Sequence, residues 1–177
     1  VLENSQRLAA GHAAHDILLW GARGSGKSAL VKSTSVAVQA GGKSLRLVEV
    51  SCDDLDSLPD LFALLASDMR PAIVFIDDIG FEQADPRMRH IRSVLDGGLA
   101  ARPAHVRLYV TANRRHIVPR NLEEQASAIN PRDVIDDNLA LADRFGLSLG
   151  FHTCTQEDWL DMVAGYARHL GLSFDGQ

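Results

Sequence analysis

The stretch Gly21-Ala22-Arg23-Gly24-Ser25-Gly26-Lys27-Ser28 separates a short apolar run from a helical pattern. Its glycines allow successive backbone N–H groups to turn inward around a polyphosphate, in conformations that a side chain would obstruct. Lys27 can reach the β- and γ-phosphate oxygens, and the Ser28 hydroxyl is a ligand for Mg²⁺. The expected helix directs the positive end of its dipole at the same anion. The candidate nucleotide-binding residues are therefore these eight and the next one, Ala29.

The flanks of this loop give it the context that a phosphate loop requires. His15–Trp20 is a short apolar run with strand character, and Ala29–Ala40 has a helical pattern that Gly41-Gly42 ends. The alternative is a chance glycine-rich turn with a lysine, expected on the order of once in a hundred chains of this size or less. The strand–loop–helix order favours nucleoside triphosphate binding.

The bulk properties indicate one domain, with room for part of a second, in a chain of 177 residues with a net charge of −5. No apolar run approaches the ~20 residues of a membrane span, and residues 1–7 lack a secretory pattern. The chain begins at Val1 rather than Met, which favours a segment of a longer protein. Two isolated cysteines, Cys52 and Cys154, suit a reducing compartment. We expect a cytoplasmic protein without a membrane partner.

Arginines gather between Arg87 and Arg120, where eight of them accompany a single acid, Asp96. The negative total argues against a protein that coats nucleic acid non-specifically. The favoured interpretation is a solvated face together with arginines on the phosphate side, because arginine serves phosphate sites and subunit contacts. The alternative is a basic surface for nucleic acid or for an acidic neighbouring subunit.

Strand and helix patterns alternate along almost the whole chain. Such alternation predicts right-handed crossovers and a parallel sheet covered on both faces, with ligands bound beyond the carboxyl ends of the strands. Asp53-Asp54 is expected to cap the helix of Leu55–Ser67, and Asp158 to complete a capping box with Thr155. Further strands are expected at Ser44–Val50, Pro71–Ile76, Val106–Thr111 and Leu147–Phe151, and further helices at Asn4–Ala14, Pro86–Leu95 and Thr155–Leu170.

Two carboxylates, Asp77 and Asp78, directly follow the buried run Ile73–Ile76. Carboxylates at the end of a buried strand are costly unless they serve a cation. Asp77 fits the role of holding the Mg²⁺ that Ser28 also holds, and Asp78 can orient and polarise an attacking water. The alternative is an ordinary acidic turn, which is less favoured in a chain that also carries a phosphate loop.

Asn113 and Arg144 are weaker candidates. Asn113 follows the strand predicted at Val106–Thr111, and Arg144 precedes the strand predicted at Leu147–Phe151. An amide can donate and accept, so Asn113 could hold the attacking water, or it could simply turn the chain. Composition alone favours a surface salt bridge between Arg144 and Asp143. The seven histidines show no metal-ligand spacing.

These motifs resemble those of the AAA+ ATPases. The loop at 21–28 is similar to Walker A, Ile73–Asp78 to Walker B, Asn113 to sensor 1 and Arg144 to the arginine finger. More closely, the chain resembles a bacterial family of predicted ATP-binding proteins, domain of unknown function 815. That resemblance covers nearly the whole chain and depends on Leu18–Ser28, Asp77–Glu82, Thr111–His116 and Asp143–Leu147.

The resemblance implies an α/β P-loop NTPase (AAA+) three-layer sandwich with a five-stranded parallel sheet in residues 1–151, followed by the start of a truncated helical lid at 152–177. It implies ATP/ADP and Mg²⁺ as cofactors, and a homo-oligomer in which Arg144 acts in trans on the neighbour's site and the cycle remodels a protein client. The implied catalytic residues are Lys27, Asp78, Asn113 and Arg144, and the implied metal ligands are Ser28 and Asp77.

Two departures from the AAA+ pattern qualify these expectations. A sensor 2 arginine usually lies on a later lid helix, and the chain ends at Gln177 before one. The Walker B acids are Asp-Asp rather than Asp-Glu, a pair that also occurs in helicase loaders and replication initiators and that allows slow turnover. Alternatives to an ATP hydrolase are therefore a nucleotide-binding switch with little hydrolysis, and a helicase-loader-like ATPase that contacts single-stranded DNA. A kinase acting on a small substrate is less favoured.

Overall fold

The fold is a parallel sheet of five strands in the order β2-β3-β4-β1-β5, seen in a computed structural model. The structure describes residues 1–79, 86–96, 102–113, 143–152 and 154–172. This confirms the predicted α/β fold class. The strands are β1 (Ile17–Gly21), β2 (Arg46–Val50), β3 (Ala72–Ile79), β4 (Val106–Asn113) and β5 (Leu147–Phe151).

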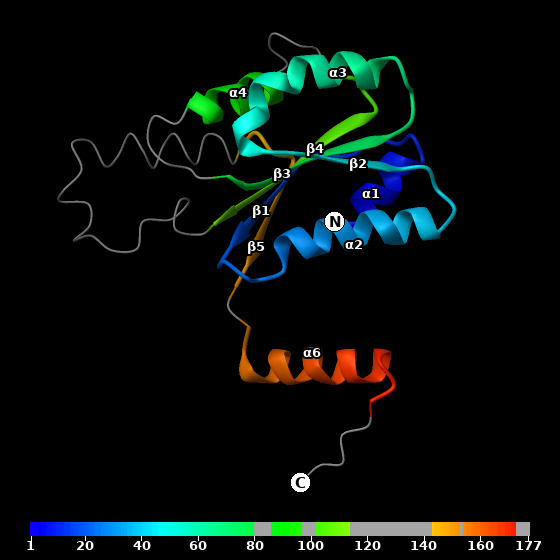
Figure 1. Cartoon of the computed structure of the whole chain (residues 1–177), viewed down its shortest axis with the longest axis vertical. Helices are drawn as coiled ribbons and strands as arrows, with labels where there is room; N and C mark the ends of the chain where they lie inside the picture. The colour runs from blue at the N-terminus through cyan, green and yellow to red at the C-terminus, as the bar shows by residue number, and fades with distance from the viewer. Residues whose placement is uncertain (80–85, 97–101, 114–142, 153, 173–177) are drawn as a thin grey trace, which may run out of the picture.

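Helices cover both faces of the sheet and give the three predicted layers (Figure 1). One face carries α1 (Leu2–Ala9) and α2 (Lys27–Ala40). The other carries the 3₁₀ helix η1 (Cys52–Ser57), α3 (Leu58–Ala66) and α4 (Pro86–Leu95). The last helix, α6 (Gln156–His169), follows β5 and is set apart from the sheet in this view.

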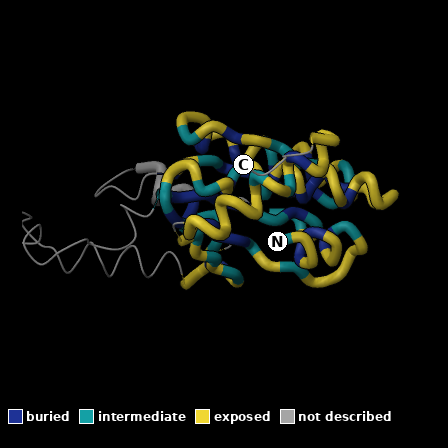
Figure 2. The backbone as a smooth tube through the Cα atoms, turned by 90° about the horizontal axis from the view of Figure 1, so that it is seen from below, coloured by how far each residue is buried: buried dark blue, intermediate teal, exposed yellow. Residues whose placement is uncertain are grey.

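The core is divided between the two faces of the central strands, as β3 illustrates. Ile73 and Phe75 pack in the cluster beneath α1 and α2, whereas Val74 and Ile76 pack in the cluster beneath η1, α3 and α4. Because both faces are covered, every residue from Ala72 to Ile76 is buried, which explains the continuous apolar run in the sequence. Figure 2 shows this buried interior between exposed outer segments.

Most predicted elements are present, with shifted bounds. Strands β3 and β4 continue to Ile79 and Asn113, so the candidate site residues lie inside the ends of these strands. The capping box of α6 is confirmed, since Thr155 and Asp158 exchange both of its hydrogen bonds. The helix α1 ends at Ala9 rather than Ala14. The backbone of His15 is instead hydrogen-bonded to the side chain of Asn4, which donates to the His15 carbonyl and accepts from the His15 N–H.

The helix predicted at Leu55–Ser67 begins three residues later than predicted and ends at Ala66. Residues 52–57 form η1, and α3 begins only at Leu58, with Pro59 in its first turn where a missing N–H costs no helical bond. The N-cap of η1 is Ser51, whose hydroxyl accepts from the Asp53 N–H at 3.3 Å, and the N-cap of α3 is Ser57, so the Asp53-Asp54 pair lies within η1. The predicted helix stop at Gly97-Gly98 and the segment 114–142 lie outside the described residues.

In the part of the chain that the structure describes, no helix has the length and apolar character needed to cross a membrane. The boundary between a core at 1–151 and a lid at 152–177 stays a prediction.

Candidate functional site

The loop between β1 and α2 adopts backbone conformations that favour glycine. Gly24 and Gly26 have φ angles of 77° and 85°, in the left-handed region where an L side chain is strained. Gly26 is the N-cap of α2, which begins at Lys27. The free N–H groups of the first helical turn therefore face the loop, as in an anion site.

Lys27 is buried against the loop that contains it. Its Nζ donates to the carbonyl oxygens of Gly21 and Ala22 at 3.2 and 2.8 Å, and to the Ser25 hydroxyl at 3.4 Å. Burial lowers the pKa of the Lys27 ammonium, while the carboxylates of Asp78 and Asp77 oppose that shift. A phosphate group would give this desolvated cation the charged partner that the loop carbonyls do not supply.

Ser28 and Asp77 bring two hard oxygen donors together. The Ser28 hydroxyl donates to Asp77 Oδ1 at 2.6 Å, from the first turn of α2 to the end of β3. Among the described residues, no group of three or more His, Cys, Asp or Glu side chains could hold a metal. One carboxylate and one hydroxyl nevertheless fit Mg²⁺, because this ion takes few protein ligands and completes its shell with phosphate and water.

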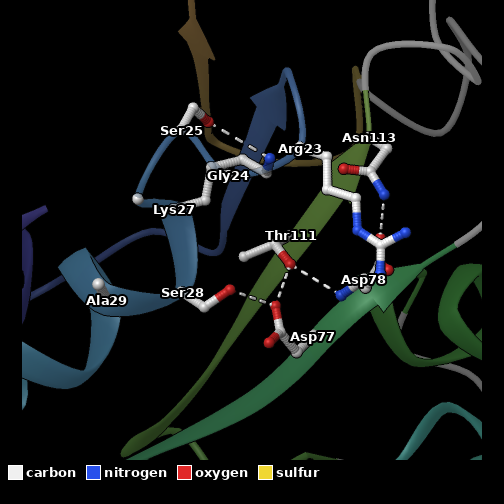
Figure 3. Close-up of a pocket in the computed structure, with 11 residues that line it drawn as sticks. Arg23, Gly24, Ser25, Lys27, Ser28, Ala29, Asp77, Asp78, Thr111 and Asn113 are labelled. Atoms are coloured by element: carbon white, nitrogen blue, oxygen red, sulfur yellow. Dashed lines mark hydrogen bonds between the residues drawn. The ribbon is translucent and has the colours of Figure 1, made fainter.

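A bulge in β3 shapes the acidic end of the site. Ile76 pairs with Val110 and Ile79 with Ala112, so Asp77 and Asp78 together oppose the single residue Thr111 on β4. In a regular strand two successive side chains would point to opposite faces of the sheet. The bulge, with Asp78 at a φ angle of 55°, leaves both acids lining one pocket (Figure 3).

Asn113 reaches the same pocket through the register of the sheet. It pairs with Gly21, the residue at which the phosphate loop leaves β1. Its side-chain Nδ2 donates to Asp78 Oδ1. The amide predicted to position water is therefore hydrogen-bonded to the acid predicted to polarise it.

Thr111 belongs to this group and was missed by the sequence analysis. Its hydroxyl donates to Asp77 Oδ1 at 2.5 Å and accepts from the Asp78 N–H at 2.8 Å. The available signal was its position two residues before Asn113, which places both side chains on the same face of one strand.

These side chains line a cavity of about 410 Å³. Arg23 extends from the loop across the cavity towards Asp78 and Asn113 (Figure 3). Gly21 and Ala22 do not line it but lie at the base of the loop, where they accept from Lys27. The lining residues are Arg23 to Ala29, Asp77, Asp78, Thr111 and Asn113.

Arg144 is not among the residues that line this cavity. Its Nε donates to Asp96 Oδ1 at 2.6 Å, and the two side chains are 37% and 50% exposed. Asp96 directly follows α4, so the ion pair joins two segments far apart in the sequence. The sequence did not predict this partner, because composition favoured a salt bridge with Asp143.

Two arginines of the segment 87–120 have structural partners at the amino ends of β1 and β4, whereas the cavity lies at the carboxyl ends of the strands. Arg102 forms a largely buried ion pair with Asp16 at 2.5 Å, and Arg107 donates to the Ala14 carbonyl at 2.6 Å. Both therefore tie β4 to the residues that precede β1, instead of facing solvent or phosphate as expected. The other arginines of this segment either lie outside the described residues or belong to α4.

A comparison with protein families finds one that matches residues 1–177, described as "Protein of unknown function (DUF815)". The match spans the chain from end to end. No curated protein matches the sequence.

Solved structures share the fold at low sequence identity. The RuvB Holliday junction branch migration motor of Thermotoga maritima is 18% identical, with a TM-score of 0.55, and the match covers 96% of this chain and 49% of that one. AMPPCP-bound DnaA from Aquifex aeolicus is 12% identical (TM-score 0.58; 97% and 51% covered). The Aeropyrum pernix ORC1 protein in complex with DNA is 13% identical (TM-score 0.56; 95% and 47% covered). These likenesses show the AAA+ fold, and the chain spans about half the length of each neighbour.

Proposed function

Since the chain belongs to the DUF815 family and has the AAA+ fold, we propose that it binds ATP with Mg²⁺ and hydrolyses it. One observation carries this proposal. A single cavity gathers a lysine, a hydroxyl, two carboxylates and an amide from the loop, α2, β3 and β4. That set matches the parts that phosphoryl transfer to water requires.

The loop and α2 supply the binding half of the site. Backbone N–H groups and the Lys27 ammonium would hold the β- and γ-phosphates, and Ser28 and Asp77 would hold Mg²⁺. When bound, Mg²⁺ neutralises charge that develops on the phosphate oxygens. Arg23, whose side chain is exposed and points over the cavity, would add a positive charge near the same oxygens.

The ends of β3 and β4 supply the hydrolytic half. Asp78 would orient a water and accept its proton, and Asn113 would hold that water and the carboxylate in one arrangement. Pre-oriented groups of this kind accelerate the reaction because little reorganisation is left for the transition state.

Arg144 completes the proposal as an arginine finger that acts in trans within a homo-oligomer. Two observations support this role: the side chain lies away from its own cavity, and it is partly exposed beside β5. Charge from a neighbouring subunit would stabilise the transition state. The cycle would then drive a conformational change in a protein client.

The decisive experiment measures ATPase activity per subunit against protein concentration. With a finger in trans, specific activity rises with concentration in the wild type and stays flat in Arg144→Ala. Arg70→Ala is the matched control, because Arg70 is also an exposed, ion-paired arginine but lies away from the cavity. Turnover that is independent of concentration, or equal in Arg144→Ala and Arg70→Ala, would refute the role in trans.

The remaining alternatives have distinguishable outcomes. ATP binding without turnover at any concentration would favour a nucleotide-binding switch. Binding of single-stranded DNA that weakens steeply with rising salt would favour the helicase-loader-like alternative, for which no contact of the described residues gives support. If Lys27→Ala binds and turns over ATP like the wild type, the proposal itself is wrong.

A further inference from the structure

The end of β3 carries a hydrogen-bond chain that links the proposed metal ligands to the proposed water-orienting residues. It begins at the Ser28 hydroxyl and passes through Asp77 Oδ1 to the Thr111 hydroxyl. From there it continues through the backbone N–H of Asp78 to its carboxylate and to Asn113. Thr111 is the member of this chain that contacts both acids.

The bulge explains why a hydroxyl is needed at this position. Two residues of β3 oppose one residue of β4, so the regular backbone ladder cannot satisfy every group there. At the bulge the Asp78 N–H donates to the Thr111 side chain, at 2.8 Å. This hydrogen bond is partly buried, so the Thr111 hydroxyl satisfies an N–H at the point where the bulge interrupts the regular ladder.

The Thr111 hydroxyl also donates a hydrogen bond to the carboxylate of Asp77. Because a hydroxyl has one proton and two lone pairs, it can donate to Asp77 and accept from Asp78 at the same time. Thr111 itself is buried, with 1% of its surface exposed, and both of its hydrogen bonds to the acids are partly buried. Asp78 is held at a φ angle of 55°, a conformation that needs support from its surroundings for a residue other than glycine.

We infer that Thr111 is a positioning residue that couples the Mg²⁺ site to the water site. It holds the β3 bulge, which points the side chains of Asp77 and Asp78 towards the same cavity. The coupling half of this inference rests on the proposed function. The geometric half does not, because the bulge and its hydrogen bonds exist without nucleotide.

The first test uses the protein without nucleotide and compares Thr111→Val with Thr111→Ser. Valine keeps the shape and removes the hydroxyl, whereas serine keeps the hydroxyl. Hydrogen exchange of the Asp78 amide should accelerate by about tenfold or more in Thr111→Val and stay near the wild-type rate in Thr111→Ser. Thr34→Val is the matched control, because Thr34 is a threonine of α2 that is 5% exposed and does not line the cavity.

The second test measures the affinity for a fluorescent ATP analogue in EDTA and again in Mg²⁺. Removing a residue that orients a metal ligand typically costs about 10- to 100-fold in metal affinity or activity. In Thr111→Val we expect a loss of that size in the Mg²⁺-dependent gain in affinity and in the single-turnover rate. Affinity in EDTA should stay within about twofold of the wild type, and Thr111→Ser should restore the Mg²⁺ dependence.

The outcomes separate this inference from the proposed function. If Asp78 exchange and the Mg²⁺ dependence are alike in Thr111→Val and Thr34→Val, the inference is overturned. An equal loss of affinity in EDTA and in Mg²⁺ also overturns it, because that pattern reports general damage. If the wild type binds no nucleotide, the proposed function fails, whereas Asp78 exchange still decides whether Thr111 holds the bulge.

Discussion

At the scale of single residues, two glycines of the phosphate loop are required for different reasons. Gly21 has a φ angle of 153°, and a Cβ built on it would lie 2.2 Å from the carbonyl oxygen of Phe151 in the paired strand β5. Gly24 has a φ angle of 77° but open space around it, with no atom within 4 Å of a Cβ. The first position therefore combines strain with a backbone clash, and the second involves strain alone.

This contrast predicts unequal costs for two alanine substitutions. Gly24→Ala should lower the free energy of unfolding by about 1–2 kcal/mol, the cost of a left-handed residue. Gly21→Ala should lower it by about 3 kcal/mol or more, because strand backbone cannot move aside as a flexible side chain can. Urea denaturation of both variants measures the difference, and equal destabilisation would contradict the predicted clash.

At the scale of elements, a buried polar network fastens α1 to the sheet. The Tyr109 hydroxyl on β4 contacts the Ser5 hydroxyl at 2.8 Å and accepts from Asn4 Nδ2 at 3.0 Å. Asn4 also bonds the backbone of His15, just before β1. Burial raises the pKa of Tyr109 above its ordinary value of 10.0, while the hydrogen bonds from Ser5 and Asn4 act in the opposite direction.

The raised pKa predicts an alkaline loss of stability with a definite sign. The folded protein holds the Tyr109 proton more tightly than the unfolded chain does. This contribution is therefore complete below pH 10 and disappears as the pH rises through the folded-state pKa. Tyr109→Phe should cost about 1–3 kcal/mol at neutral pH, because it leaves buried partners unpaired, and its deficit should narrow above pH 10.

Urea denaturation at a series of pH values checks this prediction. Tyr166→Phe is the control, because Tyr166 is the other tyrosine of the chain and is 70% exposed. A deficit of Tyr109→Phe that stays constant from pH 7 to strongly alkaline pH would show that the phenol does not titrate with folding.

At the scale of the whole molecule, nucleotide binding should stabilise the fold, because the cavity is built from three elements that only the folded chain brings together. A ligand at a concentration 100 times its Kd adds about 2.7 kcal/mol to the free energy of unfolding. We expect ATP with Mg²⁺ to raise the melting temperature of the wild type, and removal of Mg²⁺ to reduce that rise.

Two lysines of α2 provide a matched pair for this measurement. Lys27→Ala should abolish the thermal shift caused by ATP with Mg²⁺, because Lys27 lines the cavity. Lys32→Ala should retain the shift, since Lys32 instead forms an exposed ion pair with Glu49 at 2.9 Å. Identical shifts in both variants would place the nucleotide elsewhere.

The phosphate loop, the buried strand before Asp77 and the alternation of strands and helices could be predicted because each depends on residues close together in the chain. Strand–loop–helix order and turn chemistry are local properties, so they appear directly in the residue types. The interpretation of Asp53-Asp54 as a helix cap was wrong because both residues lie inside η1, which Ser51 caps, and α3 begins only at Leu58.

The sequence by itself determined the parallel fold and the chemical groups at its candidate site. Only the tertiary structure decided how those groups meet. It contains the bulge that points Asp77 and Asp78 towards one cavity, the Thr111 hydroxyl between them, and the ion pair of Arg144 with Asp96. The physical reason is that register and long-range ion pairs depend on the packing of segments far apart in the chain. A one-residue change in register would leave every local pattern intact and move these side chains to another face.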